Sequence, residues 1–233
     1  MKTPLLAFFC LASLSSFSQI RNWNQIGTEG IVSQDSTTKK GYTLVFISKD
    51  SAFSDVTKQK MTDAFFTVYP KEAKRFNKKV MKRVIFLVDP AYKGVAATSG
   101  GIVRYSPKWM AEHPEDIDVV THEVMHIVQG YPGGAGPGWL TEGIADYVRY
   151  TYGVNNEAGK WSLPNYDASH AYTKSYRITA RFLVWLEKNK KKNMVTKLDG
   201  AMRSKTYTAD IWKELTGKTL DELWSEYASN PVI

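Results

Sequence analysis

The chain has 233 residues, of which 43% are hydrophobic and 23% are charged, and its formal net charge is +8. This composition excludes a disordered chain and is enough to bury a substantial core, so we expect a single globular domain. The basic residues are dispersed in short groups without any nucleic-acid-binding motif, so we expect no nucleic-acid partner. The positive charge still allows attraction to acidic polysaccharide or to a cell surface.

The first residues are typical of a secretory signal peptide. Lys2 precedes an apolar run over residues 5–14, and the small residues that follow favour cleavage near Ser18–Gln19. This run is too short to span a bilayer, and no later segment is a second candidate. We therefore expect a secreted or periplasmic protein without stable membrane insertion. It would consist of a signal peptide (1–18), a weakly structured lead-in (19–40) and one folded domain (41–230).

Cys10 is the single cysteine, and removal of the signal peptide would remove it. The mature chain could then form no disulfide, so its stability has to come from the hydrophobic core. A cysteine nucleophile and a thiolate metal ligand are excluded for the same reason. The alternative, a lipoprotein anchored through Cys10, is disfavoured because this residue lies in the middle of the apolar run.

The N-terminal half of the domain combines strands with a helix. Residues 42–47 and 84–88 are rich in β-branched and aromatic side chains, which predicts two buried strands. Between them, Ser54 and Asp55 predict the start of an amphipathic helix that Pro70 would interrupt or restart. A third, short strand is expected over residues 100–106.

Helices dominate the rest of the chain. The acidic segment 114–116 predicts a helix through Gln129, which the loop 130–138 ends because it contains five glycines and two prolines. Further helices are predicted over residues 139–150, 176–189, 194–202, 209–215 and 220–227. The pattern indicates an α+β fold, with a small mixed sheet in the N-terminal lobe and a helical C-terminal lobe.

The helix predicted over residues 114–129 contains His122, Glu123 and His126. Residues four apart lie on one face of a helix, so the two imidazoles can bind one metal ion. Glu123 would then face the water bound to that ion. This HExxH pattern is typical of zinc peptidases, in which the histidines bind Zn²⁺ and the glutamate is the general base.

A catalytic zinc ion needs a third protein ligand and an open position for water. Glu142 and Asp146 lie four apart on the next predicted helix, which a single loop returns to the first. We expect Glu142 to bind the metal and Asp146 to accept the free N–H of a ligand histidine, which would fix that ring. The alternative assigns Asp146 to the metal.

The oxyanion of a tetrahedral intermediate needs a hydrogen-bond donor. Tyr176, His170 and Tyr172 are the candidates, in this order of preference. Tyr176 comes first because a tyrosine at the start of this helix resembles the aminopeptidase zincins, which use one as this donor. A phenol donates a hydrogen bond without changing the net charge of the site.

The resemblance extends beyond these residues. The Glu-x-x-x-Asp helix after HExxH is similar to that of the glutamate-zincins, which include thermolysin and the aminopeptidases. The chain resembles the basic secretory protein family of plants and bacteria, in blocks at residues 122–129, 142–149, 161–164, 176–183, 215–220 and 223–224. The resemblance covers roughly residues 42–227 and implies a zincin-like catalytic domain over residues 41–230. In such a domain the strand before the motif is an open edge above the metal, where an extended peptide can pair.

Two departures from the family pattern bear on the shape of the cleft. The loop 130–138 is short and rich in glycine and proline, and the helix around Phe182 has no cysteine. Gln129 and Arg149 belong to the matching blocks, and we interpret both as structural. Gln129 could support the site or end its helix, and Arg149 could pair with Asp146 or with a helix terminus.

Together these features predict a secreted, monomeric, Zn²⁺-dependent metallopeptidase that hydrolyses peptide bonds in a peptide or protein substrate. The alternative is a non-catalytic exported protein of the same fold that binds carbohydrate or a cell surface. Seven tryptophans, thirteen tyrosines and the positive charge favour it. A purely structural zinc site is disfavoured, because such sites are usually closed by four protein ligands.

Overall fold

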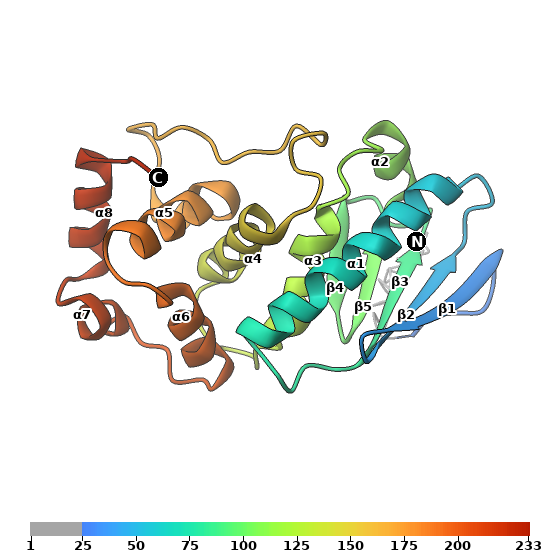
Figure 1. Cartoon of the computed structure of the whole chain (residues 1–233), viewed down its shortest axis with the longest axis horizontal. Coiled ribbons are helices and arrows are strands. Elements are labelled where there is room, and N and C mark those ends of the chain that lie inside the picture. The colour runs from blue at the N-terminus through green and yellow to red at the C-terminus, as the bar shows by residue number, and fades with distance from the viewer. Residues whose placement is uncertain (1–24) are drawn as a thin grey trace, which may run out of the picture.

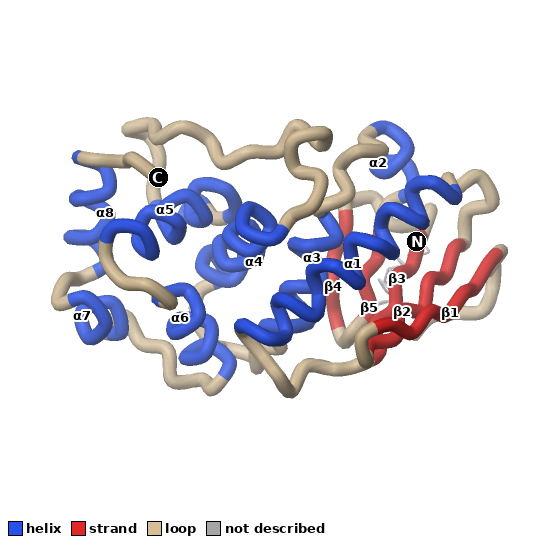
Figure 2. Tube along the Cα trace, in the orientation of Figure 1, coloured by secondary structure: helices blue, strands red, loops and turns tan. Residues whose placement is uncertain are grey.

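The computed structural model describes residues 25–233, so the predicted signal peptide and its cleavage site lie outside the described residues. A sheet with its covering helices forms one end of the molecule, and helices alone form the other (Figures 1 and 2). The expected division into a mixed N-terminal lobe and a helical C-terminal lobe is confirmed. Among residues 25–233, no helix combines the length and the apolar character that a membrane crossing requires.

Five strands of the described chain form one mixed sheet in the order β1-β2-β3-β5-β4. They are β1 (Ser33–Lys39), β2 (Tyr42–Ser48), β3 (Arg83–Val88), β4 (Ala96–Ser99) and β5 (Ile102–Tyr105). The central pairs β2–β3 and β3–β5 are parallel, whereas β1 and β4 are antiparallel to their neighbours. The two outer strands of the sheet are therefore β1 and β4.

Both outer strands differ from the sequence-based expectation. The segment of β1 was expected to be part of a weakly structured lead-in, because it has no apolar residue; it pairs with β2 over its whole length. The expected edge strand over residues 100–106 is β5, which lies inside the sheet. Gly100 and Gly101, with φ of 57° and 80°, form the turn that leads from β4 into β5. The open edge is therefore β4, and the prediction that β5 would be the edge is wrong.

The helix α1 (Asp55–Arg75) packs on one face of the sheet and continues through Pro70. Ser54 caps its start by accepting a hydrogen bond from the backbone N–H of Thr57. Proline lacks the N–H that would bond the carbonyl of Phe66, and the Nζ of Lys40 donates to this carbonyl instead, at 3.1 Å. This substitute donor explains why the predicted interruption does not occur.

Two helices lead to the centre of the molecule. A short helix, α2 (Pro107–Glu112), lies outside the predicted elements; Ser106 caps it, and proline occupies its first position. The next helix, α3 (Val119–Gln129), begins later than expected, because residues 114–118 form turns. In these turns the buried carboxylate of Asp118 accepts the backbone N–H groups of Val154 and Asn155 and so ties this segment to the end of the following helix.

The predicted C-terminal helices are all present, with ends within three residues of the expected ones. They are α4 (Gly138–Tyr152), α5 (Tyr176–Asn189), α6 (Met194–Arg203), α7 (Ile211–Thr216) and α8 (Leu220–Ser229), and a single 3₁₀ turn, η1 (Tyr172–Lys174), precedes α5. One hydrophobic cluster runs from Phe86 in the sheet through Val124 of α3 to Phe182 of α5. Burial of this continuous core fixes α3 and α4 beside one another.

Candidate metal centre

The helix α3 holds the predicted HExxH residues inside the molecule. It lies between α1 and α4 in Figure 1, and His122 and Glu123 are buried in it. Apolar residues such as Val124 fill its other faces, so the position of the helix is set by packing. Gly130 ends it in the left-handed conformation, with φ of 51°, directly after the segment that forms the site.

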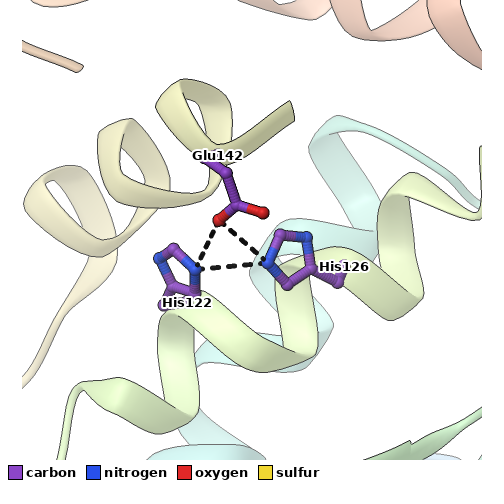
Figure 3. Close-up of side chains that lie close together, drawn as sticks. All are labelled: His122, His126 and Glu142. Atoms are coloured by element: carbon purple, nitrogen blue, oxygen red, sulfur yellow. Dashed lines mark hydrogen bonds and ion pairs between the residues drawn. The ribbon is translucent and has the colours of Figure 1, made fainter. Parts of the chain in front are cut away.

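The side chains of His122, His126 and Glu142 converge on one point between α3 and α4 (Figure 3). The Nε2 atoms of the two histidines are 3.2 Å apart. The Oε2 atom of Glu142 lies 3.2 Å from Nε2 of His122 and 3.6 Å from Nε2 of His126. Three possible metal-ligand atoms from two helices therefore face one another at short range.

A hydrogen bond at Nδ1, the ring nitrogen on the side away from the shared point, orients each imidazole. The Nδ1 of His122 lies 2.7 Å from Oδ1 of Asp146, and the Nδ1 of His126 lies 2.8 Å from Oε1 of Gln129. Both partners are oxygen acceptors, so each Nδ1 donates a hydrogen bond and each Nε2 faces the shared point. Asp146 thus contacts the ring of His122 on the side away from the shared point, and Glu142 is the carboxylate that faces both rings.

The electrostatics of this cluster favour a positive charge at its centre. Burial lowers the pKa of His122, but the carboxylates of Asp146 and Glu142 have the larger effect and raise this pKa to about 10. Burial raises the pKa of Glu142, but its contacts with the two histidines dominate and lower the pKa below its ordinary value. A proton or a metal cation at the shared point would satisfy the same groups.

Glu123 lines the same cleft as this triad and contacts the sheet. Its Oε2 accepts a hydrogen bond from the hydroxyl of Thr98 on the edge strand β4, with 2.6 Å between the oxygens. The Thr98 hydroxyl also lies 3.0 Å from the backbone carbonyl of Glu123. Thr98 thus connects the edge of the sheet to the predicted general base, a link that the sequence-based analysis missed.

A cleft of about 970 Å³ opens beside the triad. Residues 95–98 of the edge-strand region form one wall, and α3 and α4 form its floor. Its lining also includes aromatic and cationic side chains: Tyr92, Trp109, Tyr131, Trp161, Tyr176, Arg149 and Arg177. The cleft is large enough for several residues of an extended peptide.

Of the three candidate oxyanion donors, the structure brings one to the cleft. Tyr176 lines it, and its ring lies nearly parallel to that of His122, with 6.1 Å between the centroids. His170 lies in an exposed loop, where its ring accepts a hydrogen bond from the backbone of Asp167. The hydroxyl of Tyr172 donates to Asp221 of α8, at 2.7 Å, and so faces away from the cleft.

Arg149 connects side chains that line the cleft, and among the described residues its ion-pair partner is Asp116 and not Asp146. It forms an ion pair with Asp116, and its guanidinium carbon lies 4.5 Å from the centre of the Trp161 ring. Asp116 also accepts a hydrogen bond from the indole of Trp109, at 2.9 Å. The predicted pairing with Asp146 is therefore replaced by a link between α4 and the loop before α3.

The chain is similar to known proteins in sequence and in fold. The chain matches the basic secretory protein family model, described as peptidases of plants and bacteria, over residues 31–227. No curated protein matches the sequence.

Two solved structures are similar in fold at low identity. One is an aminopeptidase N family protein from Idiomarina loihiensis, with 10% identity and a TM-score of 0.49 over 84% of this chain and 46% of that one. The other is a variant of the M1 zinc metallopeptidase from Deinococcus radiodurans, with 11% identity and a TM-score of 0.40 over 85% of this chain and 48% of that one. The chain spans about half the length of these two proteins.

Proposed function

The chain belongs to the basic secretory protein family of plant and bacterial peptidases, and from this premise we propose that it is a secreted, zinc-dependent peptidase. The observation that supports the proposal most directly is the convergence of His122, His126 and Glu142 beside Glu123 at the floor of an open cleft. The signal-peptide pattern before residue 19 supports export.

The three ligand atoms fit a zinc ion. Two atoms that are each about 2.0–2.1 Å from a tetrahedral Zn²⁺ lie about 3.3–3.4 Å from one another. The three separations between His122, His126 and Glu142 are 3.2, 3.2 and 3.6 Å. Two histidines and one glutamate form a typical catalytic set, which leaves a fourth position for water.

When bound, zinc supplies a Lewis acid that lowers the pKa of a water molecule toward ~7 and polarises the scissile carbonyl. Glu123 accepts a proton from the attacking water as its hydroxyl adds to the carbonyl carbon. The same carboxyl then gives this proton to the departing amine nitrogen when the C–N bond breaks. Oε2 is held by Thr98, whereas Oε1 accepts no hydrogen bond from residues 25–233 and is the oxygen that transfers the proton.

We assign the oxyanion donor to Tyr176. The negative charge of Glu142, followed by partial burial and the charge of Asp146, raises the pKa of this phenol. The hydroxyl therefore stays protonated at neutral pH and can donate a hydrogen bond to the developing oxyanion. His170 and Tyr172 have no part in this assignment, because both lie outside the cleft.

The test compares the wild-type chain with a Glu123→Gln variant. Metal analysis of both purified proteins is expected to find about one zinc per chain. A peptide library should be cleaved by the wild type, and a chelator should abolish cleavage. The variant should keep its zinc and lose about 10²–10⁴-fold in kcat.

A Glu214→Gln variant is the matched control, because Glu214 is exposed on α7. It should keep both zinc and activity. Unchanged hydrolysis in Glu123→Gln would overturn the mechanism, and a purified wild type that binds no zinc would favour the non-catalytic binding protein instead.

A further inference from the structure

Among residues 25–233, no strand pairs with the outer side of the edge strand β4, which lines the cleft. In an antiparallel pair, alternate residues exchange hydrogen bonds with the neighbouring strand, and the residues between them point their N–H and C=O groups outward. The backbone N–H of Ser106 donates to the carbonyl of Val95, and Ala97 pairs with Arg104 two residues along. The outward residues of β4 are therefore Ala96 and Thr98.

These outward groups lie above the proposed catalytic base. Ala96 and Thr98 both line the cleft, and the Thr98 side chain holds the carboxylate of Glu123. An extended peptide that pairs with Thr98 would therefore pass directly beside Glu123. The number of peptide residues that can pair with β4 depends on whether the outward carbonyl of Ala96 is accessible to the peptide.

The outward carbonyl of Ala96 already has a hydrogen-bond partner, the side chain of Tyr92. Its hydroxyl donates a hydrogen bond to this carbonyl, with 2.9 Å between the two oxygens. The ring also lines both the catalytic cleft and a second cavity of about 830 Å³ beside it, so it stands between the two. Tyr92 therefore prevents an additional strand from pairing with this carbonyl at the open edge of the sheet.

Gly94 lets the ring adopt this position. A Cβ added at Gly94 would lie 2.5 Å from the Tyr92 hydroxyl oxygen and 2.9 Å from its Cζ, closer than two such atoms can approach. The backbone of Gly94 is not in the left-handed region, so the chain itself would accept an alanine there. A methyl group at this position would instead displace the phenol from Ala96.

We propose that Tyr92 is a specificity-determining residue that limits how far an extended peptide substrate can pair with β4. This inference rests on the proposed peptidase function. Thr98 can exchange hydrogen bonds with the peptide through both its N–H and its C=O, but the carbonyl of Ala96 is occupied. The phenol at this carbonyl lies where a substrate residue opposite Ala96 would have to pair, so extension of the peptide past Thr98 gains no hydrogen bond to this carbonyl and adds little affinity.

Peptide binding as a function of length tests this limit. The probes are capped, fluorescently labelled Thr-Ala repeats of about four to about ten residues, and the host is the zinc-loaded Glu123→Gln chain, which should bind without cleaving. In this host, the affinity for the peptide should stop rising once the peptide is long enough to extend past Thr98. With Tyr92→Ala added, the longest peptides should bind about three- to tenfold more tightly, the effect of one recovered hydrogen bond, while the shortest are unchanged.

Gly94→Ala provides the second, independent variant, because it keeps the hydroxyl and moves the ring. It should produce the same gain for long peptides. Tyr150→Ala is the matched control, since Tyr150 is 44% exposed on α4 and lies outside the cleft. It should leave the dependence on length unchanged.

The outcomes separate the two proposals. Long peptides that bind both variants no better than the host would overturn the role of Tyr92, and so would a failure of every peptide to bind. A wild type that binds the peptides and zinc but cleaves nothing would overturn the peptidase function alone, because the binding series still decides the role of Tyr92.

Discussion

Gln129 accepts a hydrogen bond from the imidazole of His126, with 2.8 Å between its Oε1 and Nδ1 of the ring. Its Nε2 donates to the backbone carbonyl of Thr141, at 2.9 Å. This second bond fixes the orientation of the amide, because only the nitrogen can donate to a carbonyl. Thr141 precedes Glu142, so one side chain connects the ring of one proposed ligand to the helix that holds another.

A Gln129→Met variant should therefore bind zinc more weakly. Methionine has a similar size but cannot orient the ring of His126 or hold Thr141. Loss of such a supporting contact typically costs about 10–100-fold in metal affinity. Competition with a chelator of known affinity measures this loss. Gln59→Met on the solvent-exposed side of α1 is the control, and equal zinc affinity in the two variants would contradict the role of Gln129.

Thr98 is expected to act on the rate through Glu123. A Thr98→Val variant keeps the shape of the side chain but removes the hydroxyl that lies 2.6 Å from the Glu123 carboxylate. The carboxylate then loses its fixed position, and we expect kcat to fall about tenfold while KM and zinc content are unchanged. Steady-state kinetics on a cleaved peptide provides the measurement.

Two further variants sharpen this test. Thr98→Ser restores a hydroxyl and should recover most of kcat. Thr67→Val removes a hydroxyl that bonds only a carbonyl of its own helix, and its kinetics should match the wild type. If Thr98→Ser is as slow as Thr98→Val, then the hydroxyl is not the cause.

The sequence predicts that the side chains of His122, His126 and Glu142 lie close together, because the geometry that brings them together is local. His122 and His126 are one helical turn apart, and a single loop returns Glu142 to them, so helix geometry brings the three side chains together. No such local geometry applied to His170 and Tyr172, the second and third candidates for the oxyanion donor, and neither lines the cleft. Both are close to Tyr176 in sequence, but the chain between residues 167 and 176 turns repeatedly and directs them elsewhere.

The outer strands were not predictable from hydrophobic pattern. β1 consists only of polar and charged residues, and its position depends on hydrogen bonds to β2. β4 lies among glycines and alanines, a composition that indicates a loop. Because β4 was missed, its contact with Glu123, the proposed general base, was missed as well. Each of these strands pairs with the strand that directly follows it in the chain. Hydrogen bonds of the hairpin place it there, and the pattern of apolar side chains does not reveal them.

The backbone conformation of Ser175 is expected to lower the unfolding free energy of the chain. Its φ of 63° and ψ of −178° lie in a region that is essentially restricted to glycine, directly before Tyr176 at the start of α5. A Ser175→Gly variant should gain about 1 kcal/mol of unfolding free energy, since relief of strain exceeds the added chain entropy. The midpoint of thermal unfolding should rise by about 2–4 °C.

Ser175→Ala is the control for this substitution, because alanine keeps the Cβ that makes the conformation unfavourable. It should not raise the midpoint. A gain in Ser175→Ala equal to that in Ser175→Gly would show that the serine hydroxyl, and not the backbone conformation, lowers the stability.

Glu72 is fully buried on α1, and neither of its carboxyl oxygens has a hydrogen-bond partner in the described part of the chain. Burial raises its pKa well above the ordinary value of 4.5, against a smaller opposite effect of His122. The folded chain therefore holds Glu72 protonated, whereas the unfolded chain ionises it above about pH 4.5. Unfolding then releases a proton, so the contribution of Glu72 to stability is greatest below this pH and decreases as the pH rises toward its folded pKa.

A Glu72→Met variant removes this titration and fills the same space with an apolar side chain. Near pH 4.5 its unfolding free energy should lie close to that of the wild type, and the advantage of the variant should grow to about 1–3 kcal/mol near pH 7.5. Urea unfolding at several pH values measures the difference, with chelator present so that zinc release does not contribute. Glu214→Met, on an exposed helix face, should show no such trend. An advantage of Glu72→Met that shrinks as the pH rises would mean that the buried carboxyl is ionised in the folded chain.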